Sequence, residues 1–250
     1  MAARNAAFFD LDNTMVKGSA LYFLGKAMYR RGFFKKADIS KFVVANARFR
    51  LTGTEKPDVI SRFQEAAEQF LAGHDVHELY TIAESVYDEF ISPALIKGTI
   101  ELANNHLKND EEVWLVTAAS EDLAKLIAEK LGFTGAIGTK VEIIDDKYTG
   151  KLIGNILHGV EKARAVRELS AARGFSLNNC HAYSDSASDL PLLRSVGTPH
   201  AINPDARLRI VALAEKWQIH DFRRFRVLNR WLGPIVSRII AVGELRKPRR

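Results

Sequence analysis

The stretch FFDLDNTMVKG, residues 8–18, places two carboxylates directly after an apolar segment. Residues 6–9 read AAFF, an apolar run that predicts a buried strand. Asp10 and Asp12 follow it, and in an extended chain the side chains of residues two apart project to the same side. Like charges held this close make each other costly to ionise. The pair therefore indicates a cation bound between the two carboxylates, or a proton on one of them.

The segment after this strand predicts helices. Between about residues 18 and 96 apolar residues recur at helical spacing, for example in ALYFLGKAMY and HELYTIAESVYDEF, and no convincing strand interrupts them. Ser92 and Pro93 then predict the N-cap and first position of a helix that runs to about His106.

From there strands and helices alternate. Strands are expected at EVWLVT (112–117), CHAYS (180–184), PHAIN (199–203) and WQIHDF (217–222), and TKVEIIDDKYTGKLIG (139–154) predicts a hairpin. Helices are expected at 120–132, with Ser120 as N-cap and Gly132 as stop, and at 161–173, 190–196 and 205–216. This alternation predicts an α/β fold with a parallel sheet covered on both faces.

The domain organisation follows from the same pattern. Because the first strand belongs with the later ones, residues 18–96 are expected to be an all-helical cap inserted into a core formed by residues 1–17 and 97–222. Residues 223–250 are expected to form a basic amphipathic tail.

Polar residues stand where the predicted strands end, and in open parallel sheets ligands bind beyond the carboxyl ends of the strands. Besides the first two aspartates, this edge should carry Thr117, Ala118, Lys162, Asp185, Ser188 and Asp189. Clustered carboxylates beside a lysine indicate a hard cation such as Mg²⁺ together with a phosphate, and a carboxylate can itself act as the nucleophile. An all-oxygen site accepts Mn²⁺ as well.

In this order, the motifs resemble those of the haloacid dehalogenase superfamily of phosphatases, in the branch that contains phosphoserine phosphatase. FFDLDNT resembles its first motif, DxDxT, and LVTAAS its second. EKARAV carries the lysine of the third, and YSDSASDLPLL resembles the fourth, which has two aspartates four residues apart. The resemblance covers about residues 6–220 and implies a Rossmann-like parallel sheet with a small helical cap.

The resemblance also implies a role for each matching residue. Asp10 would be the nucleophile and a Mg²⁺ ligand, and Asp12 the general acid and base as well as a metal ligand. Asp185 and Asp189 would complete the metal site. The transferring phosphoryl group would be bound by Thr117, Ala118, Lys162 and Ser188. The reaction would be the hydrolysis of a small phosphate monoester through an aspartyl-phosphate.

The substrate is less defined than the reaction. Phosphoserine phosphatases read the substrate's amino group with a glutamate after DxDxT, whereas MVKGSALYF (15–23) has no carboxylate, and none follows before Asp38. A phosphorylated metabolite or a lipid-derived monoester is therefore expected, with phosphoserine as the alternative. An alternative of another class is a phospho-ligand or membrane-binding module that lacks turnover.

The charge of the chain is concentrated in the tail. The net charge is +6 over 250 residues, but residues 223–250 hold nine Lys or Arg and one Glu, which leaves 27 basic and 29 acidic side chains elsewhere. Nucleic-acid binding is therefore not expected. The tail's apolar stripe predicts contact with an anionic membrane, or docking on the sheet or on a second subunit. The protein is accordingly expected to be a monomer or a homodimer. One cysteine and no signal peptide predict a cytoplasmic protein, with the tail reaching the inner membrane face if it binds lipid.

Overall fold

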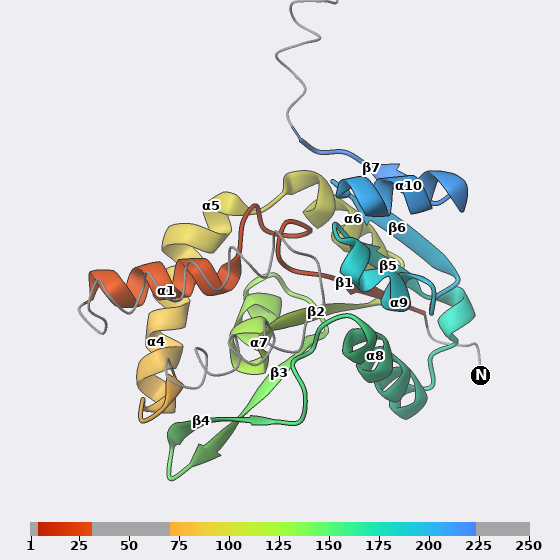
Figure 1. The fold of residues 1–250 in the computed structure, drawn as a ribbon. Coiled ribbons are helices and arrows are strands. Elements are labelled where there is room, and N and C mark those ends of the chain that lie inside the picture. Colours follow the sequence, from red (N-terminus) through yellow and green to blue (C-terminus); the bar gives the residue numbers. More distant parts are fainter. Residues whose placement is uncertain (1–4, 32–70, 224–250) are drawn as a thin grey trace, which may run out of the picture. The chain divides into compact units, whose positions relative to one another are not determined.

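The sheet of this protein is mostly parallel, as the sequence predicts. The computed structural model describes residues 5–31 and 71–223. Its strands are β1 (Ala6–Phe9), β2 (Glu112–Ser120), β3 (Gly135–Ile144), β4 (Lys147–Ile153), β5 (His181–Ser184), β6 (Thr198–Ile202) and β7 (Gln218–His220). They are ordered β4-β3-β2-β1-β5-β6-β7, and among these neighbours the β3–β4 pair alone is antiparallel (Figure 1).

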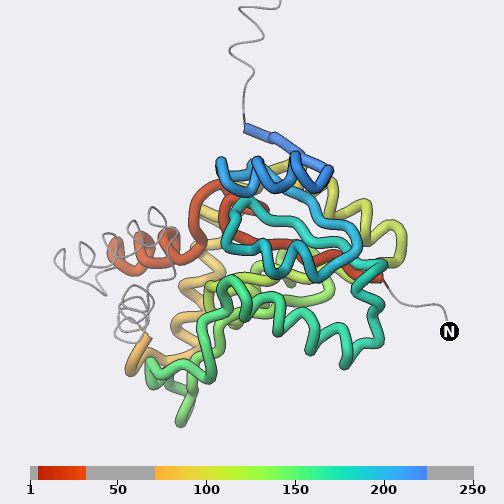
Figure 2. The backbone as a smooth tube through the Cα atoms, turned by 45° about the vertical axis from the view of Figure 1, so that its right-hand side comes forward, coloured from red at the N-terminus to blue at the C-terminus, as the bar shows by residue number. Residues whose placement is uncertain are grey.

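Helices cover both faces of this sheet (Figures 1 and 2). Their bounds are α1 (Ala20–Arg30), α4 (Val76–Val86), α5 (Ser92–Ala94), α6 (Lys97–Lys108), α7 (Glu121–Lys130), α8 (Val160–Arg173), α9 (Leu190–Leu193) and α10 (Ala206–Ala214). Short helical turns are a π-helix at Tyr87–Ile91 and 3-10 turns at Leu177–Asn179 and Ala187–Asp189.

The alternating side chains of β1 bind the two layers together. Phe9 packs into a core with α1, α4, α6 and α7, whereas Phe8 packs into a core with α8, α9 and α10. Both rings are fully buried, which fixes β1 in the centre of the sheet and directs its carboxyl end to the edge where Asp10 follows.

The described parts of the segment 18–96 are helical, but the division into core, cap and tail stays a prediction. Much of that segment, including KFVVANARFR (41–50), lies outside the described residues, as does the tail after residue 223. The chain forms two units, residues 1–220 and 221–250, and the sheet and its covering helices belong to the first. No described helix has the length and apolar character needed to span a membrane.

The prediction of an N-cap at Ser92 and of one helix from there to about His106 is wrong, since Ser92 is the first residue of the three-residue α5 and Ile91 holds the N-cap position. The helix α4 runs through the π-helix into α5, and the break falls at Leu95 and Ile96 instead. There the backbone pairs with the segment after β1: Ile96 N donates to Met15 O at 2.8 Å, and Leu95 forms a bridge with Val16. These backbone groups are used by tertiary pairing and cannot continue a helix.

Two strands are longer than the sequence predicts. The strand β2 continues past residue 117 to Ser120, which occupies the N-cap position of α7 but makes no side-chain capping bond. In β3 the first half pairs with β2 and the second half with β4, so this strand serves both the sheet and the hairpin. The hairpin turns at Asp145 and Asp146, both with positive φ.

Helix α4 offers a test of local stability. The Asp75 carboxylate caps its N-terminus by accepting hydrogen bonds from His77 N at 2.9 Å and Glu78 N at 3.1 Å. Replacing Asp75 with Ala should lower the free energy of unfolding by about 1 kcal/mol, whereas Asp75→Asn, which keeps a capping oxygen, should cost much less. Urea unfolding measures both, and equal stability of the Ala and Asn variants would contradict the capping role.

Candidate active site

The carboxyl ends of β1 and β5 bring three predicted site residues into direct contact. Asp10 follows β1 and extends its pairing, since Asp10 N donates to Tyr183 O at 2.9 Å. Lys162, in the first turn of α8, donates from Nζ to Asp10 Oδ1 at 2.6 Å and to Asp189 Oδ2 at 2.8 Å. All three residues are buried, with exposed fractions of 6% or less. The ammonium group therefore holds two carboxylates from different elements in a site shielded from water.

Two hydroxyl groups support these carboxylates, and the sequence did not single them out for that purpose. Thr14 Oγ1 donates to Asp10 Oδ2 at 3.3 Å, and Ser184 Oγ donates to Asp189 Oδ2 at 2.7 Å. Thr14 is the threonine of the DxDxT motif, so the signal was present in the sequence. Ser184 ends β5 and could have been recognised by its place at a strand end.

The electrostatics of the cluster follow from burial. Burial raises the pKa of Asp10 to about 6 from its ordinary 3.8, with Lys162 acting in the opposite direction. The pKa of Asp185 is raised well above its ordinary value by burial and by the charges of Asp10 and Asp189. For Lys162, burial alone would lower the pKa, but the charges of Asp10 and Asp189 outweigh it and the pKa is raised. Burial thus makes ionisation of Asp10 and Asp185 costly, and the Lys162 ammonium offsets part of that cost.

Asp12 lies beside the cluster and is anchored separately. Its Oδ1 accepts a hydrogen bond from Ala20 N at 2.9 Å, at the N-terminus of α1. Its charge raises the pKa values of both Asp10 and Asp185, as expected for a nearby carboxylate. This bond ties Asp12 to the start of α1.

The remaining predicted residues stand at the same edge but have local partners. Thr117, in β2, is buried and its Oγ1 accepts from Ala119 N at 3.2 Å. The carbonyl of Ala118 accepts from Thr139 Oγ1 at 2.8 Å. Ser188 lies in the 3-10 turn at 187–189, where its Oγ bonds Ser186 Oγ at 3.0 Å. None of these bonds reaches the Asp10–Lys162–Asp189 cluster, so their roles in binding phosphate stay predictions.

The cluster fits a hard cation by two observations. The buried Oδ1 of Asp189 accepts no hydrogen bond from any described residue, which leaves a carboxylate oxygen with unused capacity. Burial first, and then the neighbouring carboxylates, raise the pKa values of Asp10 and Asp185, so a bound cation would favour their ionised forms. Carboxylate oxygens are the ligands that Mg²⁺ prefers.

A pocket of about 200 Å³ lies between α1, α4 and α7. Its lining is largely apolar and includes Leu24, Leu79 and Leu126. Two carboxyl-bearing residues, Asp122 and Glu129, also line it, and Asp122 Oδ2 accepts from Tyr148 OH at 2.9 Å. The pocket reaches Ser120, three residues after Thr117.

Comparison with known proteins links this arrangement to one family. The family model described as haloacid dehalogenase-like hydrolase matches residues 7–194. A protein named phosphoserine phosphatase SerB1 from Mycobacterium tuberculosis is 46% identical over 238 residues, covering 95% of this chain and 77% of that protein. A histidinol-phosphatase from Neisseria meningitidis is 29% identical over 224 residues, covering 88% of this chain and 100% of that protein.

A solved structure shares the fold. A protein of unknown function from Bordetella pertussis Tohama I superposes with a TM-score of 0.77 at 28% identity. The match covers 88% of this chain and 100% of that one.

Proposed function

Because this chain belongs to the haloacid dehalogenase-like hydrolase family and is one of its phosphatases, we propose that it hydrolyses a small phosphate monoester through an aspartyl-phosphate on Asp10. The observation that carries this proposal is the buried contact of Lys162 Nζ with both Asp10 and Asp189. A fixed positive charge beside a nucleophilic carboxylate is suited to a phosphoryl group whose charge shifts during transfer.

The first step uses Asp10 and Asp12. A carboxylate oxygen of Asp10 attacks phosphorus, the bond from phosphorus to the ester oxygen breaks, and Asp12 donates a proton to that oxygen as it leaves. The bond from Ala20 N to Asp12 Oδ1 ties this acid to the start of α1. The products of this step are an alcohol and a phosphorylated Asp10.

The second step restores the enzyme. Asp12, now ionised, takes a proton from a water molecule whose oxygen attacks phosphorus. The bond between phosphorus and Asp10 breaks, and inorganic phosphate leaves. Asp12 is again protonated, and Lys162 and Thr14 hold Asp10 in place for the next cycle by the bonds that they donate to its two oxygens.

We propose Mg²⁺ as the cofactor of this site. Asp10, Asp185 and Asp189 would hold it by their carboxylates and Asp12 by its backbone carbonyl oxygen, since these residues gather at one edge and Asp189 Oδ1 is unused. A bound Mg²⁺ supplies positive charge that neutralises and orients phosphate oxygens. Thr117, Ala118 and Ser188 are proposed to bind the same phosphate from β2 and from the turn after β5.

The leaving group of the reaction is an alcohol, and the relatives indicate which kinds to test. The relatives are named for phosphoserine and for histidinol phosphate, both phosphate esters of an amino alcohol. Phosphoserine is therefore a specific alternative, although the segment 15–23 carries no carboxylate. A phosphorylated metabolite or a lipid-derived monoester stays the first candidate, because that segment offers no carboxylate to an amino group.

The experiment that tests the proposal is phosphate release by the full chain. We expect release in excess Mg²⁺ from at least one of phosphoserine, histidinol phosphate, lysophosphatidic acid, sugar phosphates and nucleotides, and loss of release on addition of EDTA. The compound with the highest kcat/KM identifies the leaving group. Inertness towards all of them, with phosphate analogues still bound, would favour a binding module without turnover.

The cellular location and the tail belong to the same proposal. We propose a cytoplasmic enzyme that acts on a small molecule and not on nucleic acid. Contact of the basic tail with an anionic membrane, or its docking as part of a monomer or homodimer, falls on residues outside the described part of the chain and stays a prediction.

A further inference from the structure

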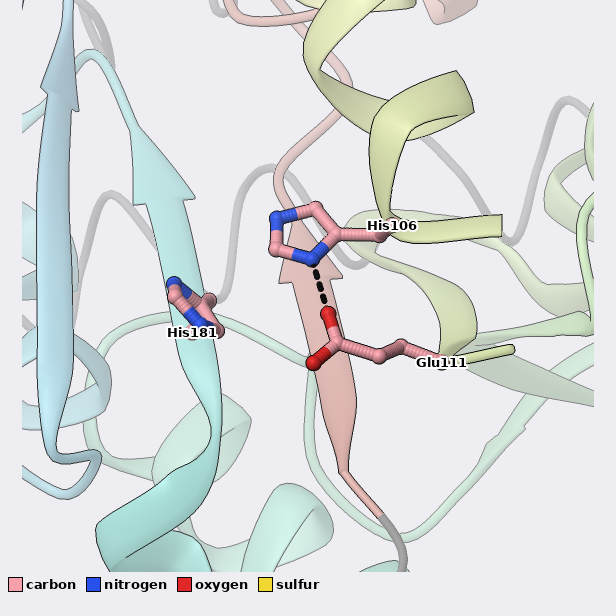
Figure 3. Close-up of side chains that lie close together, drawn as sticks. All are labelled: His106, Glu111 and His181. Carbon is pink, nitrogen blue, oxygen red and sulfur yellow. Dashed lines mark hydrogen bonds and ion pairs between the residues drawn. The ribbon is translucent and has the colours of Figure 1, made fainter. Parts of the chain in front are cut away.

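Histidines gather at the end of the sheet opposite the candidate active site. His106 lies near the end of α6, Glu111 directly precedes β2, and His181 is the first residue of β5 (Figure 3). Since β2 and β5 are parallel, their starts lie together at the amino edge, whereas Asp10 and Asp185 follow the carboxyl ends of β1 and β5.

These three side chains converge on one point. One ligand atom from each of His106, Glu111 and His181 lies within 4.8 Å of the other two. The imidazole Nδ1 of His106 pairs with Glu111 Oε2, and Figure 3 shows the His181 side chain beside this pair. His106 is buried, while Glu111 and His181 are half-buried, so the cluster is reached from the surface.

Each of the three also has an outer partner that fixes its orientation. The second ring nitrogen of His106, Nε2, lies 2.8 Å from Tyr183 OH. His181 Nδ1 lies 3.1 Å from His200 Nε2. The other oxygen of Glu111 accepts from Asn5 Nδ2 at 3.2 Å. Histidine ligands of metals almost always use their other nitrogen in such a bond, which sets the tautomer and the ring orientation.

The outer partners are themselves rigidly packed. The ring of Tyr183 stacks on Phe9 on one side and on His200 on the other, with centroids 4.2 Å apart in both cases. His200 Nδ1 continues the chain of contacts to His220 Nε2 at 3.3 Å. An ion pair between His106 and Glu111 would need only these two side chains. Here His181 adds a second imidazole, which has an outer partner of its own in His200.

We propose that His106, Glu111 and His181 form a second metal site, which takes one Zn²⁺ or a similar imidazole-binding divalent cation. Two imidazoles and one carboxylate are a ligand set that suits Zn²⁺, and water can fill the fourth position. The candidate active site offers carboxylate oxygens, which suit Mg²⁺. The two sites therefore differ in ligand chemistry and lie at opposite edges of the sheet.

The test is Zn²⁺ retention by the full chain in excess Mg²⁺, which competes for the carboxylate site. Protein stripped with a chelator is dialysed against buffered Zn²⁺ and Mg²⁺, and bound zinc is measured per chain. The variants are Glu111→Gln and His181→Gln, each of which removes one ligand, and His200→Gln, which removes an outer partner. His77→Gln is the matched control, because it removes an exposed imidazole from α4, a helix that contributes no residue to the cluster.

We expect one Zn²⁺ per chain in wild type and in His77→Gln, and loss of this zinc in Glu111→Gln and His181→Gln. His200→Gln should bind about 10- to 100-fold more weakly, the usual cost of losing an outer partner. Thermal unfolding in chelator shows whether each variant is folded, and Zn²⁺ should raise the Tm of wild type but not of His181→Gln. No retained zinc in wild type, or equal retention in folded Glu111→Gln and His181→Gln, would overturn the proposal.

Discussion

Replacing Asp10 with Asn should reduce kcat by about 10⁴-fold or more, because loss of a covalent nucleophile removes the whole reaction path. The amide has nearly the same shape as the carboxylate, and Lys162 keeps its bond to Asp189. We therefore expect the variant to fold. Asp88→Asn, an exposed change in the π-helix, is the matched control and should leave kcat unchanged. Phosphate release and thermal unfolding measure the two properties separately.

The same experiment can separate the nucleophile from the acid. With p-nitrophenyl phosphate, whose leaving group needs no proton, Asp12→Asn should still transfer phosphate to Asp10 but hydrolyse the product slowly. Radiolabelled phosphate from the substrate should then remain on acid-quenched Asp12→Asn protein and be absent from Asp10→Asn protein. Label of equal amount in both variants would show that Asp10 is not the residue that is phosphorylated.

Replacing Lys162 with Met should impair both catalysis and stability. The change removes the donor that contacts Asp10 Oδ1 and Asp189 Oδ2 and leaves two buried carboxylates without their cation. Breaking a buried ion pair from one side costs about 3–5 kcal/mol of folding free energy. Loss of one charged group from a site that stabilises a transition state costs about 10²- to 10³-fold in kcat.

The stability loss should depend on pH with a defined sign. With Lys162 present, the pKa of Asp10 is about 6, above its ordinary 3.8, and without the lysine it rises further. A carboxyl group whose folded pKa is raised binds its proton more readily when folded, so folding becomes more favourable as the pH falls through that value. The deficit of Lys162→Met should therefore be largest near about pH 8 and smaller near about pH 5.

A matched lysine on the surface provides the control. Lys125 in α7 pairs with Glu121 at 2.8 Å, but its side chain is 57% exposed. Lys125→Met should change the free energy of unfolding by less than about 1 kcal/mol, the usual range for exposed pairs. Urea unfolding of both variants at the two pH values measures the stability deficit, and kcat of both variants measures the effect on catalysis. A Lys162→Met variant with wild-type kcat would show that Lys162 takes no part in catalysis.

The sequence predicted the α/β fold, and it also predicted that Asp10, Lys162 and Asp189 would meet, because parallel strands bring their carboxyl ends to one edge. It did not predict the helix break at Leu95, since that break depends on backbone pairing with Val16, a residue about eighty positions away. Local propensity carries no information on such a contact.

The sequence did not predict the hydroxyl groups that support the carboxylates, or the histidine cluster, for a different reason. A hydroxyl group such as Ser184 is compatible with many roles, and its bond to Asp189 becomes visible only when both side chains are placed. The His106, Glu111 and His181 cluster draws on residues from two distant parts of the chain, without the short regular spacing by which metal motifs are recognised. Its outer partners depend on the order of strands in the sheet.

The double use of β3 has a mechanical consequence. The hairpin that it forms with β4 is joined to the start of α4, since Val76 N donates to Asp146 O at 2.9 Å and Tyr148 N to His74 O at 3.0 Å. Any swing of α4 against the sheet would have to carry the hairpin with it. The bend would then fall where β3 changes partners, at Thr139 and Lys140.

Thr139 is itself a mechanical link. Its hydroxyl donates to Ala118 O at 2.8 Å and accepts from Leu157 N at 3.1 Å, so it ties the start of the hairpin to the end of β2 and to the segment before α8. A substitution at Thr139 would thus disturb both the backbone beside Thr117 and the segment that leads into the helix carrying Lys162. The start of the hairpin is therefore fixed to the predicted phosphate-binding edge through a single side chain.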